Sequence, residues 1–173
     1  MLAEGCEIIG GEEVRMAPAG YRHNDINYNL ARMIKTYMKG FYRKVTMDSY
    51  IKLGEGSIYA PDIAVFCGPY TVNRDLIEGI PDFVAEILSP ATRKNDISVK
   101  KDAYERFGVR EYWIVNPREE SIEAYLLRDG KYALDNVYHS LSDEERRLLL
   151  LEQPPLRVSF CDVEMDIGEV FEE

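Results

Sequence analysis

The chain has 173 residues, of which 46% are hydrophobic and 30% are charged. This length and composition are typical of one globular domain with a substantial core, so we expect a single domain over residues 1–173. The formal net charge of −10 at pH 7 argues against a protein that binds nucleic acid over its whole surface. No apolar run is long enough to span a membrane, and the N-terminus lacks a signal pattern. The three cysteines are widely spaced without a metal-ligand pattern, which indicates free thiols and predicts a cytoplasmic protein.

The N-terminal part of the chain predicts a hairpin and then a helix. Residues 7–16 form two short strand-like runs around a Gly-Gly turn. Residues 21–39 space their apolar side chains for one helical stripe, and Gly40 ends the pattern. His23 lies in the first turn of this helix, where a capping or packing role and a functional role are both open.

Two strands and a loop are expected next. Residues 42–52 alternate well enough for one strand, and residues 61–67 predict a second strand that is introduced by Pro61-Asp62. Residues 70–80 are expected to form a surface loop or a short helical turn. Asp62 stands at the first position of its strand, where an aspartate commonly forms a turn that satisfies its own side chain.

The following strand, residues 82–88, contains an acidic residue that requires a partner. The period of two places Val84, Glu86 and Leu88 on one face of this strand. An unpaired ionised carboxylate among apolar residues would cost several kcal/mol. We therefore expect Glu86 to meet a cation, a metal ion or a network of hydrogen-bond donors.

A helix over residues 93–107, ended by Gly108, and a strand over residues 111–116 complete a β-α-β unit. Lys100 lies within one broad arc of this helix, among the apolar residues Ile97, Val99, Ala103, Tyr104 and Phe107. A lysine in this position either directs its charge inward or buries only its stem and extends its charge to solvent. Asp96 projects to the same side, and at the helix start the role of N-cap is open to it.

The remaining residues predict the outer part of the sheet. Residues 121–127 and 131–138 form a hairpin around Asp129-Gly130, a strong turn signal. Ser142 is placed to cap a short helical turn, and residues 156–173 are expected to form a closing strand and an acidic tail whose apolar side chains dock on the domain. The predicted fold class is therefore α/β, a mixed β-sheet flanked by helices, with an N-terminal hairpin.

Asp62, Glu86 and Lys100 form a chemically meaningful set if their elements are neighbours. Two carboxylates can converge on one Mg²⁺ or Mn²⁺ ion, since these ions prefer oxygen ligands together with water. A lysine close by can orient a water molecule and neutralise charge that develops on a phosphate. Asp82 is a poorer ligand, because it lies about 13 Å from Glu86 along the strand at roughly 3.3 Å per residue.

These residues resemble the signature of the PD-(D/E)XK nuclease superfamily. Pro61-Asp62 and Glu86-Ile87-Leu88 match its metal-binding residues, and the strings at residues 86–92 and 108–115 are similar to those of the Uma-type restriction endonuclease family. The resemblance covers nearly the whole chain, and it implies a restriction-endonuclease-like fold and a metal-dependent endonuclease that hydrolyses DNA. It also implies that Asp62 and Glu86 bind Mg²⁺, or Mn²⁺, and that Lys100 assists the attacking water.

The chain departs from the superfamily pattern at two positions. Leu88 stands where the superfamily has its usual lysine, which makes Lys100 on the following helix the candidate for that role. Asn116-Pro117 replaces the Asp-Pro that is common in the family after the tryptophan-containing strand. A catalytically inactive nucleic-acid-binding or assembly module that retains the fold is thus an alternative to the enzyme.

Further residues are candidates for contacts around this site. The basic run between Arg93 and Arg110 is either a solvated helix face or a surface that contacts phosphates. The candidates for DNA contact are Arg93, Lys94 and Lys101, and the second-tier site candidates are Glu7, His23 and Tyr104. DNA is the expected partner, and the two cuts that a duplex requires favour a homodimer by analogy.

Overall fold

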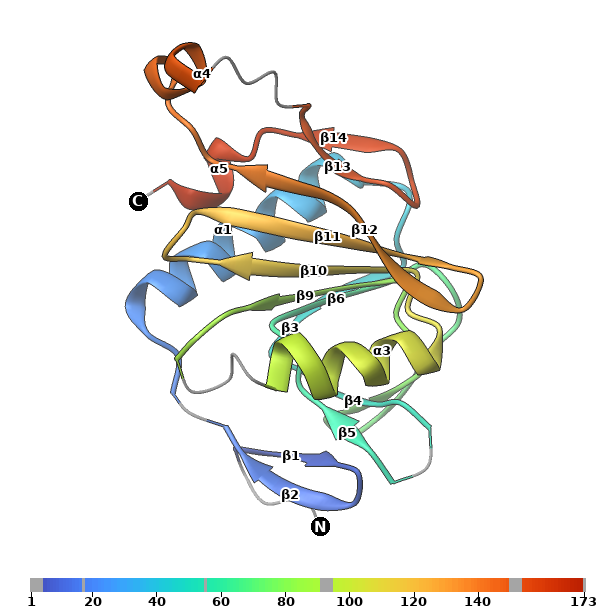
Figure 1. Ribbon diagram of the computed structural model, residues 1–173. Coiled ribbons are helices and arrows are strands. Elements are labelled where there is room, and N and C mark those ends of the chain that lie inside the picture. Colours follow the sequence, from blue (N-terminus) through green and yellow to red (C-terminus); the bar gives the residue numbers. More distant parts are fainter. Residues whose placement is uncertain (1–4, 17, 55, 91–94, 150–153, 173) are drawn as a thin grey trace.

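The structure, a computed structural model, describes residues 5–16, 18–54, 56–90, 95–149 and 154–172. At its centre lies a six-stranded mixed sheet, which confirms the expected fold class (Figure 1). Its strands, in spatial order, are β12 (Lys131–His139), β11 (Ser121–Arg128), β10 (Glu111–Asn116), β9 (Phe83–Ile87), β6 (Ile63–Phe66) and β3 (Lys44–Met47). The strands β9 and β10 run parallel, and the other neighbours pair antiparallel.

The N-terminal hairpin belongs to a second sheet. The hairpin consists of β1 (Cys6–Ile9) and β2 (Glu12–Arg15), as expected, and both glycines of its turn have positive φ. The sheet has the order β2-β1-β5-β4-β8-β7, in which the other strands are β5 (Ile58–Tyr59), β4 (Tyr50–Lys52), β8 (Leu76–Glu78) and β7 (Thr71–Asn73). In Figure 1 the hairpin lies at the bottom of the molecule, below α3 (Lys101–Phe107).

Two predictions for the middle of the chain are wrong. The single strand predicted over residues 42–52 is divided into β3 and β4, because Asp48 adopts a left-handed conformation (φ 48°) where the chain passes from one sheet to the other. The loop or helical turn predicted over residues 70–80 is the hairpin of β7 and β8. Ile77 is buried there, and β8 pairs in parallel with β4, a contact that the local sequence does not show.

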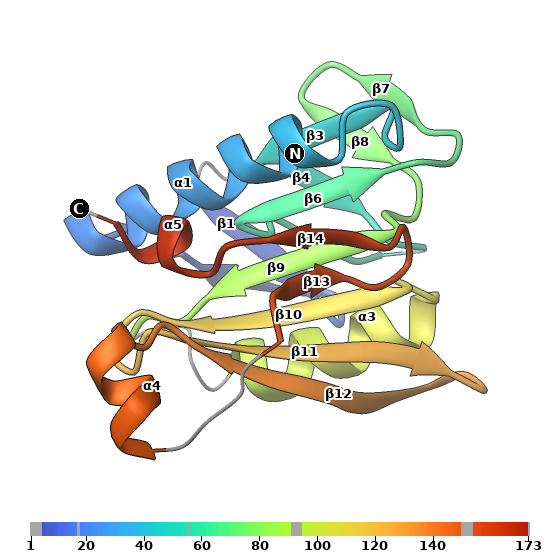
Figure 2. The same ribbon diagram turned by 90° about the horizontal axis from the view of Figure 1, so that it is seen from above.

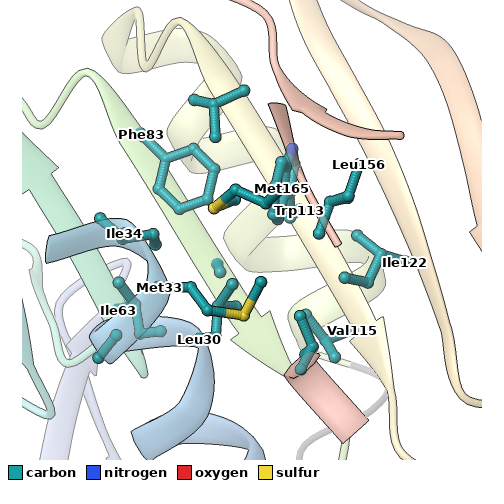
Figure 3. Packing of buried hydrophobic residues seen from close by; sticks show 14 of the residues in the cluster. Leu30, Met33, Ile34, Ile63, Phe83, Trp113, Val115, Ile122, Leu156 and Met165 are labelled. Atoms are coloured by element: carbon teal, nitrogen blue, oxygen red, sulfur yellow. The ribbon is translucent and has the colours of Figure 1, made fainter. Parts of the chain in front are cut away.

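Helices and a small hairpin cover the two faces of the main sheet (Figure 2). One face packs against α1 (Tyr21–Tyr37), α5 (Gly168–Phe171), β13 (Leu156–Val158) and β14 (Val163–Met165). Phe83 and Ile87 of β9 point to this side, and the ring of Phe83 meets Trp113 edge-on with centroids 4.9 Å apart (Figure 3). Val84 and Leu88 belong to the other core, which includes residues of α3 and the second sheet, so the alternation predicted for β9 is confirmed.

The helix predicted over residues 93–107 begins, within the described residues, as a π-helical turn (Asp96–Lys100) and continues as α3. Gly108 ends it in the left-handed conformation (φ 85°), as expected. The predicted apolar arc is wrong at Ile97 and Val99, which are 44% and 42% exposed. The wider π-helical turn instead buries Asp96 and Lys100, whose charged side chains pair with each other.

The outer hairpin and the C-terminal segment complete the domain. The strands β11 and β12 turn at Asp129-Gly130, as predicted, and α4 (Asp143–Leu149) follows Ser142, whose hydroxyl accepts the Glu145 N–H. The single closing strand expected over residues 156–173 is instead the β13–β14 hairpin and α5, although its apolar side chains dock as predicted. Among the described residues, no helix is both long enough and apolar enough to cross a membrane.

A buried carboxylate fastens the turn of the β13–β14 hairpin to the main sheet. Glu111 of β10 is fully buried, and it accepts hydrogen bonds from the Trp113 indole N–H (2.8 Å) and the Phe160 backbone N–H (3.0 Å). Burial raises the pKa of Glu111 to about 7, although these donors act in the opposite direction. In the folded protein this carboxyl therefore changes its charge near neutral pH.

We expect Glu111 to make the folded protein less stable as the pH rises. The unfolded chain releases this proton near pH 4.5 and the folded chain near pH 7, so the free energy of unfolding falls between these values, by roughly 3 kcal/mol. In Glu111→Gln this decline should be absent, and the stability advantage of the wild type over the variant should shrink as the pH rises. Urea unfolding across this pH range measures the advantage; a constant difference contradicts the prediction.

Candidate active site

A cavity of about 240 Å³ brings together residues from distant parts of the sequence. It lies between the N-terminal hairpin, the first turn of α1, the end of β9 and the π-helical turn. The predicted site residues that line it are Glu7, His23, Asp62, Glu86 and Lys100. The two predicted metal ligands thus face one cavity from neighbouring strands, Asp62 from the start of β6 and Glu86 from β9.

The ammonium group of Lys100 lies among the carboxylates of this cavity. Its Nζ is 3.0 Å from Glu7 Oε1, 3.2 Å from Glu86 Oε1 and 3.5 Å from Asp96 Oδ1, and only 4% of the residue is exposed. The alternative that this lysine extends its charge to solvent is therefore wrong. Burial by itself lowers the pKa of Lys100, but the three carboxylates outweigh it and raise the pKa above its ordinary value. Lys100 is thus a cation at neutral pH, so it can donate hydrogen bonds but cannot serve as a general base.

Glu86 is a buried carboxylate whose charge is only partly compensated. It is 2% exposed, and its Oε1 accepts a hydrogen bond from the Tyr104 hydroxyl at 2.7 Å besides its contact with Lys100. These contacts confirm that Glu86 needs a cation and a donor. Burial raises the pKa of Glu86 well above its ordinary value; Lys100 opposes this rise, and neighbouring carboxylates add to it. The pKa is thus raised for both members of the Lys100–Glu86 pair, mainly by burial for Glu86 and by the surrounding carboxylates for Lys100.

Asp62 joins the two strands that carry the site. Its Oδ2 accepts the Ile87 N–H of β9 at 2.6 Å, and its Oδ1 lies 3.2 Å from His23 Nε2. Burial lowers the pKa of His23, but the hydrogen bond and charge of Asp62, together with more distant carboxylates, raise the pKa above its ordinary value. Asp62 thus stabilises the protonated form of the imidazole relative to the neutral form. His23 is a partner of Asp62 and not a helix cap, since α1 begins after Gly20 without a side-chain cap.

Two second-tier candidates belong to the same polar network. Glu7 is 3% exposed, and its Oε1 accepts the Ala60 N–H at 2.8 Å besides its contact with Lys100. Tyr104 is fully buried, packs against the rings of two other tyrosines, and directs its hydroxyl to Glu86. Both residues hold a charged neighbour in a fixed position, which is a positioning role.

Sequence reasoning missed the contributions of Asp48 and Asp96 to the cavity. Asp48 follows β3, and its backbone N–H donates to the carbonyl oxygen of Asp62. No local signal marks Asp48, because its position depends on the pairing of β3 with β6. The N-cap role that was open to Asp96 is wrong, since Asn95 occupies the N-cap of the π-helical turn and the Asp96 carboxylate pairs with Lys100 four residues later. A spacing of four places two residues on one side of a helix, so the pairing of Asp96 with Lys100 could have been predicted from the sequence.

The predicted DNA contacts lie elsewhere or outside the described residues. Arg93 and Lys94 fall outside the described part of the chain. The Nζ of Lys101 lies 3.3 Å from the centroid of the Tyr125 ring on β11, as a cation–π contact. Lys101 is not one of the described residues that line the cavity, so its position does not support a role at the mouth of the site. Its contact with DNA stays a prediction.

The donor set of the cavity fits a divalent cation that binds few protein ligands. Negative charge is in excess in the lining, which carries Glu7, Asp48, Asp62, Glu86 and Asp96 against Arg15, His23 and Lys100. Within the described residues, no group of three or more His, Cys, Asp and Glu side chains is arranged to hold an ion by itself. Mg²⁺ commonly binds one or two carboxylates and keeps water and phosphate oxygens as its other ligands. Asp62 and Glu86 are donors of that kind.

The architecture is that of a nuclease-like α/β domain. The fold matches, with a TM-score of 0.74, the crystal structure of "a putative nuclease belonging to DUF820" from Anabaena variabilis. The two chains are 15% identical, and the match covers 96% of this chain and 89% of the other, so the likeness concerns the fold. The chain belongs to the Uma2 family, described as "Putative restriction endonuclease", whose model matches residues 3–159. This membership confirms the resemblance found in the sequence, and it supports a nuclease function in general. A search of curated proteins found no match.

Proposed function

We propose that this protein is a divalent-metal-dependent endonuclease that hydrolyses phosphodiester bonds in DNA, with the cavity as its active site. The observation that carries the proposal is the position of Lys100 Nζ, 3.2 Å from Glu86 in a cavity that Asp62 also lines. A buried cation beside two carboxylates supplies the charges that phosphoryl transfer requires.

The metal ion, Mg²⁺ or Mn²⁺, would be held by Asp62 and Glu86. A bound ion supplies a Lewis acid for a phosphoryl oxygen and lowers the pKa of a coordinated water molecule. The contact with His23 fixes the Asp62 carboxylate, and the hydroxyl of Tyr104 fixes the Glu86 carboxylate. Partners of this type orient the ligands of a metal ion before it binds.

Lys100 would act by its charge and not by proton transfer. Because it retains its proton, the ammonium group can donate a hydrogen bond to the attacking water or to a non-bridging phosphate oxygen. It thereby stabilises the negative charge that develops on the phosphate. Glu7 and Asp96 hold the ammonium group in place for this role.

A nuclease assay with single-stranded and double-stranded DNA, in Mg²⁺ or Mn²⁺ and with a chelated control, tests the proposal. We expect cleavage that stops when the ion is chelated, together with a binding isotherm when Mn²⁺ is titrated in a calorimeter. The net charge of −10 is the observation that favours the alternative of an inactive nucleic-acid-binding or assembly module. That module would bind DNA without cleavage and would show no Mn²⁺ isotherm. Cytoplasmic location and a homodimer stay predictions, and light scattering on the purified protein measures the second.

A further inference from the structure

A second depression, of about 700 Å³, adjoins the cavity. It lies at the carboxyl ends of the parallel strands β9 and β10, beside the first turn of α1. These strand ends are on the left in Figure 1. Ser89 lines both spaces, so they meet at this residue. Ligands of α/β sheets commonly bind at the carboxyl ends of parallel strands. We call this depression the strand-end groove.

Apolar side chains and an oriented amide form part of the strand-end groove. Leu88 and Pro117 supply apolar contacts. The Oδ1 of Asn116 accepts the backbone N–H groups of Arg118 (3.1 Å) and Glu119 (3.4 Å). In the described part of the chain the amide NH₂ group of Asn116 has no partner, and it is left as a donor for a ligand. An apolar surface with a fixed amide donor suits a nucleobase, which has an apolar face and a polar edge.

The groove is weakly cationic, in contrast to the acidic cavity. Its charged lining residues are Arg22, Arg118 and Glu119. Arg118 is exposed and forms no ion pair with the described residues. Arg22 is paired with Glu120 at 2.6 Å, which fixes the position of its guanidinium group. Exposed Arg118 is therefore the group that is placed to contact a phosphate.

One exposed tyrosine lies at the start of α1, one residue before the groove residue Arg22. Tyr21 is 81% exposed, and it directly precedes Arg22 of the groove and His23 of the cavity at the start of α1. An exposed tyrosine one residue before a groove arginine offers a ring on which an unpaired base can stack. Phosphate contact and base stacking are the two interactions by which single strands are held without sequence preference.

We infer that the strand-end groove binds an unpaired strand of nucleic acid and leads it to the cavity. The inference rests on the proposed nuclease function, and it specifies the substrate as a strand that is unpaired next to the bond to be cut. A continuous duplex fits less well, because duplex binding depends on many cationic contacts to phosphates and this chain carries a net charge of −10. A single strand requires fewer phosphate contacts, since stacking supplies part of the affinity.

Binding in the presence of a chelator separates this inference from catalysis. Fluorescence anisotropy would measure the affinity of the full chain for a labelled single-stranded oligonucleotide and for the matching duplex. We expect the single strand to bind about tenfold more tightly than the duplex. Arg118→Ala should weaken single-strand binding about tenfold and reduce the salt slope by about 0.7. Tyr21→Ala should weaken it about tenfold with an unchanged slope.

Matched exposed residues serve as controls. Tyr28→Ala removes another exposed tyrosine of α1 (64% exposed), and Arg43→Ala removes an exposed arginine that follows this helix. Neither residue lines the groove, so neither substitution should change the affinity. Glu119→Gln removes the negative charge of the groove and should tighten binding about threefold.

The outcomes of this experiment are independent of cleavage. The inference is overturned if the protein binds duplex and single strand equally, or if it does not bind the single strand measurably. It is also overturned if Tyr21→Ala and Arg118→Ala both retain the wild-type affinity. Each of these results counts even where metal-dependent cleavage is observed. Groove-dependent binding of the single strand without metal-dependent cleavage would instead support the groove and reject the proposed endonuclease.

Discussion

Asp62→Asn should reduce metal-dependent cleavage by a factor on the order of 10²–10³, the effect of losing one electrostatic group of an active site. The substitution preserves the volume of the side chain and an acceptor oxygen for the Ile87 N–H, which donates to Oδ2 at 2.6 Å. It removes the negative charge that a divalent ion requires. We therefore expect the fold to persist, while calorimetric titration with Mn²⁺ shows a loss of affinity in parallel with the loss of cleavage.

Asp82→Asn is the matched control for this variant. Asp82 also precedes a strand, and its Oδ2 also accepts backbone N–H groups, from Cys67 (2.7 Å) and Gly68 (3.2 Å). It is not one of the described residues that line the cavity, so this variant should cleave DNA as the wild type does. Undiminished cleavage and Mn²⁺ affinity in Asp62→Asn, or equal losses in both variants, would reject Asp62 as a metal ligand.

The β-α-β unit could be predicted from the sequence because its signals are local. Prolines bound its first strand, the alternation of that strand is regular, and Gly108 ends the helix. The helical projection selects Lys100 correctly, but partly for a wrong reason, since Ile97 and Val99 do not share its buried side. The inward direction of Lys100 arises in a π-helical turn, whose geometry a period of 3.6 residues does not describe.

The rest of the site depends on contacts between distant residues. Glu7 enters the cavity because β1 pairs with β5, and Asp48 does so because β3 pairs with β6. Short strands of this kind carry little pattern, and their pairing is decided by packing in the folded domain. Glu7 is only a second-tier candidate from the sequence, and Asp48 is no candidate at all. Local sequence thus identifies Glu86 and Lys100, and the spacing of Asp96 from Lys100 is a further local signal, whereas the positions of Glu7 and Asp48 depend on distant contacts.

Lys100→Met should also have a large effect, and the structure changes how the result must be interpreted. From the sequence alone, this variant is expected to keep its fold. The ammonium group, however, has three carboxylates within 3.5 Å, and methionine would remove the cation that these buried groups share. Breaking a buried ion pair in this way costs about 3–5 kcal/mol. The deficit should shrink as the pH is lowered, because the raised pKa of Glu86 lets this carboxyl become neutral early.

A double variant separates folding from catalysis. Glu7→Gln combined with Lys100→Met removes the negative charge of one carboxylate that Lys100 contacts in the wild type, and it retains an acceptor for the Ala60 N–H. We expect the double variant to regain part of the lost stability in urea unfolding, yet to cleave DNA on the order of 10²–10³ times more slowly than Glu7→Gln alone. Lys52→Met, which removes an exposed ion pair with Glu78, is the control for loss of a lysine and should leave cleavage unchanged. A folded double variant that cleaves as fast as Glu7→Gln would exclude Lys100 from the reaction, and its charge would then serve only to hold three buried carboxylates together.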